Sequence, residues 1–283
     1  MKTGLIMEGG AMRGLFTAGV TDIFLENGIE FDGAVGVSAG AAFGSNFKSR
    51  QAGRVIRYSK QYAKDPRFCS IRSLLKTGNL FGAEFCYHTI PDTLDLFDTQ
   101  AYLDNPMEFY VVCTDMDTGK AVYINSDEAG ENSLEFFRAS ASMPLVSQPV
   151  EIGGKRYLDG GIADSVPIKY FESIGYDRLV LILTQPYDFV KKPSTAAKLM
   201  KRFLKEYTAV AETLENRHIV YNETLDYIKE KEKNGEIFVI RPEEALPIGR
   251  VNHEPDEMQV VYDIGRDVAL KNLEKLRAFL QNK

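Results

Sequence analysis

The stretch Gly36-Val37-Ser38-Ala39-Gly40 places one serine between two glycines, after an apolar segment at 31–37 and before a run of small residues at 39–47. A serine hydroxyl is presented for attack where the backbone turns sharply from strand to helix, and that turn crowds the positions two before and two after the serine. Gly36 and Gly40 remove the crowding. The stretch therefore predicts a nucleophile elbow, although a tight strand-to-helix packing turn has the same pattern.

Short apolar runs recur along the chain and are typical of strands covered on both faces. They lie at 5–7, 34–37, 109–113, 179–183 and 237–240. Between them, helical spacing predicts helices at 16–24 with a stop at Gly28, at 39–47, at 196–207, at 212–233 and from Pro255 to the C-terminus. Alternating elements of this kind predict a three-layer α/β/α fold with a mostly parallel central sheet.

We expect a single domain over residues 1–283, a size that one α/β core accommodates. The segment 66–105 is rich in aromatic residues and in glycine and proline, which fits either an insertion packed on the core or a lid. Residues 190–283 read as a C-terminal helical extension with one added strand. Nothing in the sequence fixes the oligomeric state.

Composition argues against several functions. A net charge of -6, from 34 basic and 40 acidic residues, disfavours nucleic acid as a partner. No apolar run is long enough for a membrane span or a signal peptide, so we expect a soluble, cytoplasmic protein. Three cysteines without metal-ligand spacing and three scattered histidines predict neither a disulfide framework nor a metal site.

A glycine-rich loop follows the first expected strand, with the sequence Glu8-Gly9-Gly10-Ala11-Met12-Arg13-Gly14. Backbone N–H groups at the start of a helix lack helical partners, and such groups stabilise the oxyanion of acyl transfer. Gly9, Gly10, Ala11 and Met12 are therefore the expected oxyanion hole, with Arg13 steadying the loop or attracting an anionic substrate. The loop also approaches a dinucleotide fingerprint, but that fingerprint lacks its middle glycine here.

A serine nucleophile needs a base, and Asp159 is the first candidate. It ends an expected hairpin and is followed by Gly160 and Gly161, which let a carboxylate approach another main chain. The alternative is a capped Asp-Gly turn. The second candidate base is His253, because serine, acid and histidine follow in that order in α/β-hydrolases.

Together, the Glu-Gly-Gly-Ala-Met-Arg-Gly loop, Gly-Val-Ser-Ala-Gly and the later Asp-Gly-Gly resemble the three signature blocks of the patatin-like phospholipase family, in the same order. The resemblance covers roughly positions 4–185. It implies a patatin-like fold, a Ser38–Asp159 dyad without metal or cofactor, and hydrolysis of a lipid acyl ester. A Ser-His-Asp esterase using His253 stays open as an alternative.

Ala11 departs from the family pattern, which commonly has a third glycine there. Alanine supplies the same N–H but disfavours positive φ, so a non-catalytic lipid-binding protein is a further alternative. For contact with a membrane surface, the basic segment 191–207 fits an interfacial helix, and it fits a solvated surface helix as well.

Overall fold

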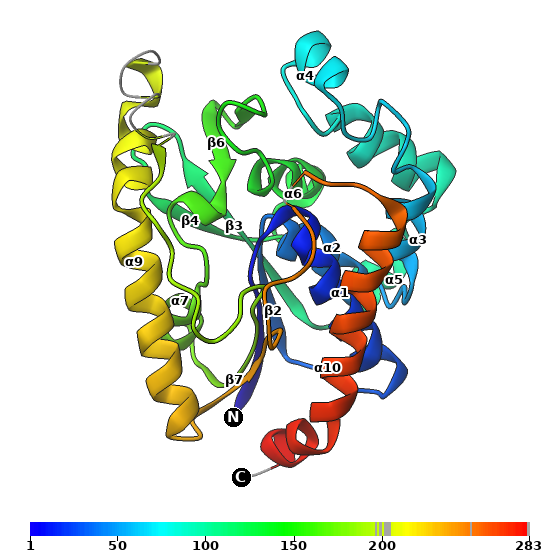
Figure 1. Ribbon diagram of the computed structural model, residues 1–283, viewed down its shortest axis with the longest axis vertical. Helices are drawn as coiled ribbons and strands as arrows, with labels where there is room; N and C mark the ends of the chain where they lie inside the picture. Colours follow the sequence, from blue (N-terminus) through cyan, green and yellow to red (C-terminus); the bar gives the residue numbers. More distant parts are fainter. Residues whose placement is uncertain (196, 198–199, 201–204, 250, 282–283) are drawn as a thin grey trace.

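The computed structural model describes residues 1–195, 197, 200, 205–249 and 251–281 (Figure 1). Its centre is an eight-stranded sheet. The strands are β1 (Lys2–Met7), β2 (Gly33–Val37), β3 (Glu108–Asp115), β4 (Ala121–Asn125), β5 (Val150–Ile152), β6 (Lys155–Asp159), β7 (Tyr176–Ile182) and β8 (Ile237–Ile240). Strands β3, β2, β1, β7 and β8 pair in parallel, whereas β4, β5 and β6 pair antiparallel. The sheet is therefore mixed and mostly parallel.

Helices cover both faces of this sheet. They are α1 (Gly14–Glu26), α2 (Ala39–Lys48), α3 (Arg54–Gln61), α4 (Ile71–Thr77), α5 (Thr99–Asp104), α6 (Ser133–Ser140), α7 (Ile168–Ser173), α9 (Thr208–Lys233), α10 (Pro255–Gln281) and the π-helix η2 (Phe85–Leu94). Short 3-10 turns are η1 (Ala11–Arg13), η3 (Gly130–Asn132), η4 (Gly160–Ile162) and η5 (Lys205–Tyr207).

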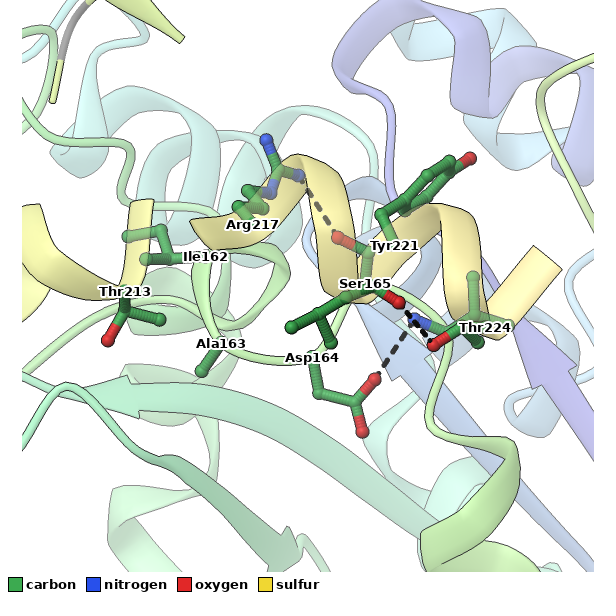
Figure 2. Close-up of a pocket in the computed structure, with 10 residues that line it drawn as sticks. Ile162, Ala163, Asp164, Ser165, Thr213, Arg217, Tyr221 and Thr224 are labelled. Carbon is green, nitrogen blue, oxygen red and sulfur yellow. Dashed lines mark hydrogen bonds between the residues drawn. The ribbon is translucent and has the colours of Figure 1, made fainter. Parts of the chain in front are cut away.

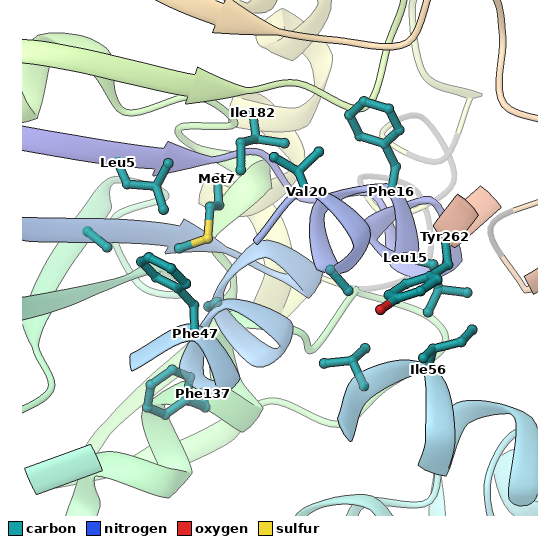
Figure 3. Packing of buried hydrophobic residues seen from close by; sticks show 14 of the residues in the cluster. Leu5, Met7, Leu15, Phe16, Val20, Phe47, Ile56, Phe137, Ile182 and Tyr262 are labelled. Atoms are coloured by element: carbon teal, nitrogen blue, oxygen red, sulfur yellow. The ribbon is translucent and has the colours of Figure 1, made fainter. Parts of the chain in front are cut away.

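The elements form three layers, with α1, α2 and α10 on one side of the sheet and α7 and α9 on the other (Figure 1). On the first side, Phe16 and Val20 of α1 pack with Met7 and Ile182 of the sheet (Figure 3). Burial of these side chains supplies the main driving force for folding. The three-layer α/β/α prediction is confirmed.

The five strands expected from apolar runs are all present. The first helix ends at Glu26, and Gly28 beyond it adopts φ +64°, as a C-terminal stop requires. Strand β4 was not predicted from the sequence. Each of its residues is only half-buried, so it carries no apolar run that would reveal it.

The segment 66–105 holds α4, η2 and α5. Its side chains Phe68, Phe85 and Tyr102 are buried and belong to the main core cluster. By contrast, Ile71 and Leu75 of α4 are exposed. One side of the segment is thus packed on the sheet domain, and α4 faces outward.

The helix expected at 196–207 falls mostly outside the described residues, and so does most of the basic segment 191–207. Of that helix, the turn η5 lies within the described part. In the described part of the chain, no helix combines the length and the apolar character that crossing a membrane requires.

Candidate active site

Ser38 lies at the turn between β2 and α2, with φ 54° and ψ −121°. Positive φ is unusual for a residue with a side chain and marks the sharp turn of an elbow. The two flanking glycines are sterically required. A Cβ on Gly36 would lie 2.4 Å from the Cα of Ala41, and one on Gly40 would lie 2.3 Å from the Met7 carbonyl oxygen.

The register of β3 locates Asp159 relative to Ser38. β2 and β4 both pair with residues 110–112 of β3, so they lie on opposite edges of that strand. β4 and β6 both pair with residues 113–114, so they also lie on opposite edges. β6 therefore continues along the edge that β2 leaves. Because Val37 pairs with Val112 and Asp159 pairs with Cys113, the backbones of Ser38 and Asp159 both lie at that junction.

The end of α6 ties these two residues together. The Ser38 N–H donates to the Ser140 hydroxyl at 2.9 Å, and that hydroxyl donates to the Val112 carbonyl at 2.6 Å. Two residues on, the Ser142 carbonyl accepts the Asp159 N–H at 2.9 Å. One short segment thus fixes the backbone of both Ser38 and Asp159.

Asp159 is buried, with 3% of its surface exposed, and it caps the turn η4. Its Oδ1 accepts the Gly161 N–H at 2.8 Å. Gly160 packs so closely on β3 that a Cβ there would lie 2.1 Å from the Val112 carbonyl oxygen. The capped turn and the close main-chain approach, weighed as alternatives from the sequence, are both present.

Cys113 lies beside Asp159 in the sheet. Burial raises the pKa of its thiol well above the usual value, and the charge of Asp159 adds to the rise. A thiol with a raised pKa stays protonated and is a weak nucleophile. Ser38 therefore has no competing thiolate at this junction.

The glycine-rich loop runs against the serine. A Cβ on Gly9 would lie 2.9 Å from the Ser38 Cβ. Among the described residues, none accepts a hydrogen bond from the N–H of Gly9, Gly10 or Ala11. Unpaired amides next to a nucleophile are suited to binding an oxyanion. Met12, the next residue, is buried in the core and anchors the loop.

Ala11 adopts φ +50°, in the left-handed region. The conformation that glycine favours is therefore kept, at a cost of about 1–2 kcal/mol for a residue with a Cβ. Arg13 folds back onto the loop, since a Cβ on Gly10 would lie 3.3 Å from its Nε. The positive φ of Ala11 and the position of Arg13 affect the shape of the loop. In both cases the backbone N–H groups of the loop stay close to Ser38.

The two later histidines make local contacts. Nδ1 of His253 lies 2.9 Å from the Val251 carbonyl oxygen, just before α10. Nδ1 of His218 lies 3.0 Å from the Glu215 carbonyl oxygen on α9. Neither of these contacts leads toward Ser38, so the geometry favours Asp159 over His253 as its partner.

The sequence profile of the family described as Patatin-like phospholipase matches residues 5–172, which include the glycine-rich loop, Ser38 and Asp159. The chain belongs to the patatin-like phospholipase family. A second profile, Domain of unknown function (DUF6363), matches residues 207–281 of this patatin-like chain, the part that holds α9, β8 and α10.

Several curated proteins are similar to this patatin-like chain. Uncharacterized protein YjjU of Escherichia coli is 28% identical over 94% of the chain and 75% of its own length. Lysophospholipase nte1 of Aspergillus niger is 27% identical over 62% of the chain, which spans 11% of the fungal protein. An uncharacterized NTE family protein of Mycobacterium bovis is 23% identical over 64% of the chain and 48% of its own length.

Among solved structures, that of VipD from Legionella pneumophila aligns with 97% of this patatin-like chain and 67% of the VipD chain. Its TM-score is 0.49 and its sequence identity is 12%.

A buried polar group that was not predicted from the sequence lies beneath the glycine-rich loop of this patatin-like protein. Glu8 is 3% exposed and accepts the Thr184 N–H at 2.7 Å and the Tyr221 hydroxyl at 2.6 Å. Tyr221 projects from α9 beside Arg217, whose Nη2 donates to the Ser165 hydroxyl at 3.1 Å (Figure 2). The C-terminal segment thereby supports both the loop and the turn after Asp159.

Three residues with side-chain hydroxyls could not be predicted from the sequence for one common reason. They are Ser140, Thr184 and Tyr221. Ser140 lies 102 residues from Ser38, and Tyr221 lies 213 residues from Glu8. Single serine, threonine and tyrosine residues have no periodic pattern, and their partners are contributed by distant strands and helices. The one available signal was Glu8, an acidic residue that directly follows the apolar run 5–7.

Proposed function

We propose that this protein is a serine acyl hydrolase that uses Ser38 as nucleophile and Asp159 as base to release fatty acid from a lipid acyl ester. The supporting observation is the junction on β3, where the ends of β2 and β6 meet and α6 ties both to one segment. Family membership and the lysophospholipase name of one relative support a lipid substrate.

In the proposed reaction, Asp159 takes the Ser38 hydroxyl proton while Oγ attacks the acyl carbonyl carbon. The carbonyl oxygen becomes an oxyanion that the N–H groups of Gly9, Gly10 and Ala11 bind, with Met12 completing the loop. Collapse of this intermediate expels the alcohol, which takes the proton from Asp159. Water then attacks the acyl-serine and gives a proton to Asp159. Asp159 passes this proton to the Ser38 Oγ as the acyl bond breaks, which releases the fatty acid and restores the Ser38 hydroxyl and the Asp159 carboxylate.

Residues 1–283 act as one catalytic domain in this proposal. The segment 66–105 is an insertion beside the site, and residues 190–283 are an extension. Through Tyr221 and Arg217, the extension braces the loop and the turn from below.

The first test is hydrolysis of a chromogenic fatty ester. Ser38→Ala and Asp159→Asn each lower kcat by about a thousandfold or more, because the nucleophile and its base act as a unit. His253→Ala is the matched control and keeps most of the activity. Loss of activity in His253→Ala with retention in Asp159→Asn would assign the protein to the Ser-His-Asp class.

A fluorophosphonate probe separates an enzyme from a lipid-binding protein of the same fold. The parent protein is expected to be labelled covalently and Ser38→Ala to be unlabelled, because the probe needs an activated serine. A parent protein that binds lipid but takes no label would favour the non-catalytic alternative.

A further inference from the structure

Helix α4 presents two large apolar side chains to solvent. Ile71 is 72% exposed and Leu75 is 84% exposed, the highest value among the large apolar side chains that the structure describes. The two lie at i and i+4 and so share one face of the helix. Single exposed apolar residues are ordinary, but an adjacent pair at this exposure is suited to burial in a partner.

Two basic residues lie next to this apolar pair. Arg72 and Lys76 also stand at i and i+4, and neither forms an ion pair with a described residue. The whole chain carries a net charge of -6. A local positive charge on an acidic protein beside exposed isoleucine and leucine is complementary to an anionic lipid surface.

The protein holds α4 firmly, so its exposed face has a fixed orientation. Ser70 caps the helix by accepting the Ser73 N–H at 2.9 Å, and Ser73 itself is buried. After the helix, the Leu80 N–H donates to the Val146 carbonyl at 2.8 Å. In Figure 1, α4 stands at one extremity of the molecule, above the end of the sheet that carries β6.

A cleft of about 860 Å³ lies under α4, between it, η2 and α6. Its lining includes Arg72 and Lys76 of α4, His88 of η2 and Arg138 of α6. Arg138 stands two residues before Ser140, whose hydroxyl binds the Ser38 N–H.

We propose that α4 is an interfacial docking helix that seats the protein on an anionic lipid surface. Ile71 and Leu75 enter the headgroup region while Arg72 and Lys76 meet lipid phosphates. When the protein is docked in this orientation, the existing cleft beneath α4 faces the lipid. Binding of α4 to the lipid surface does not depend on the proposed function, whereas the role of the cleft as a substrate route rests on it.

The test measures co-sedimentation of the full chain with vesicles at low salt. The background is Ser38→Ala, so that no vesicle is hydrolysed and the outcome is independent of catalysis. We expect binding to vesicles of phosphatidylcholine with phosphatidylglycerol and weaker binding to phosphatidylcholine alone. Ile71→Ser with Leu75→Ser lowers the partition coefficient about tenfold, and Arg72→Gln with Lys76→Gln lowers it about fivefold for each charge.

Matched controls lie on α10. Leu270→Ser removes a leucine that is 50% exposed, and Lys275→Gln removes an exposed lysine. Both controls are expected to bind vesicles like the parent. With Ser38 restored, the variant Ile71→Ser with Leu75→Ser, whose two positions do not line the cleft, hydrolyses a water-soluble short-chain ester at the parent rate but loses activity on mixed vesicles.

Three outcomes would overturn the proposal. The first is vesicle binding by the α4 variants equal to that of the controls. The second is equal binding to both kinds of vesicle. The third is a dimer of the parent in analytical ultracentrifugation that Leu75→Ser dissociates, which would assign this face to a second copy of the chain.

Discussion

Ser140 shows how one hydroxyl outside the signature blocks holds the elbow. In a continuing parallel ladder, the backbone of Ser38 would pair with β3, but the chain turns away into α2. The Ser140 hydroxyl fills the gap by accepting from Ser38 and donating to Val112. A buried N–H without a partner is costly, so this hydroxyl is a structural part of the nucleophile turn.

Ser140→Ala is expected to lower the free energy of unfolding by about 1–3 kcal/mol, because it leaves a buried N–H and a buried carbonyl unpaired. It also lowers kcat more than it raises KM, since the turn that presents Ser38 loosens. Urea unfolding and ester hydrolysis measure the two effects. Ser142→Ala is the control, because among the described residues its hydroxyl binds only the Arg138 carbonyl, and its own carbonyl still holds Asp159.

Ala11→Gly tests the strain in the glycine-rich loop. The position has φ +50°, which glycine adopts without a steric cost. We expect the free energy of unfolding to rise by about 1 kcal/mol, and thermal unfolding measures the change. Ala278→Gly in exposed α10 should instead lower stability. A loss of stability in Ala11→Gly as well would show that the left-handed conformation carries no strain.

At the level of elements, the position of α2 depends on Gly40 in its first turn. Gly40 lies against the carbonyls of Met7 and Glu8, so the helix touches the end of β1 directly. This contact brings the start of α2 next to the loop that follows β1. The distance between the elbow and the amides of the loop is thus set by backbone-to-backbone packing.

Gly40→Ala is expected to destabilise the protein by about 3 kcal/mol, because the new Cβ would overlap two backbone oxygens that cannot move aside. Activity should fall further than stability alone predicts, since α2 must shift away from the loop. Gly28→Ala is the control. It has φ +64° but open space around it, so it should cost only about 1 kcal/mol and leave kcat unchanged. Equal effects would contradict the packing explanation.

Across the whole molecule, the last helix closes the domain onto the first. α10 packs along α1, and the Tyr262 hydroxyl donates to Asp22 Oδ2 at 2.6 Å across 240 residues of sequence. Asp22 also accepts the Gly53 N–H at 2.8 Å. Burial raises the pKa of Asp22, and these two hydrogen bonds oppose the rise. The stability of this contact therefore depends on pH.

Tyr262→Phe should destabilise the protein by about 1–3 kcal/mol at neutral pH, because it takes a donor from a buried carboxylate. A raised pKa in the folded state means that stability falls as pH rises above the unfolded value. Losing the hydroxyl raises the pKa of Asp22 further, so the deficit relative to the parent grows as pH rises through the raised folded-state pKa of Asp22 in the parent. Urea unfolding across this range measures it.

Tyr227→Phe is the control for that series. Its hydroxyl donates to Glu172, which is only half-buried, so a small deficit is expected. A deficit of Tyr262→Phe that shrinks as pH rises would reverse the sign and show that Asp22 is not the group involved.

The sequence alone determined the local parts of this protein. Apolar runs, glycine spacing and helix stops depend on neighbouring residues, so the five strands with apolar runs, the elbow and the glycine-rich loop could be predicted, whereas the half-buried β4 could not. Only the tertiary structure decided that β6 continues the edge of β3 where β2 ends, that Ser140 joins the two, and that α4 projects from the surface. These three features depend on strand register and on contacts between residues far apart in the sequence. Neither register nor such contacts produce a repeating pattern in the sequence from which they could be predicted.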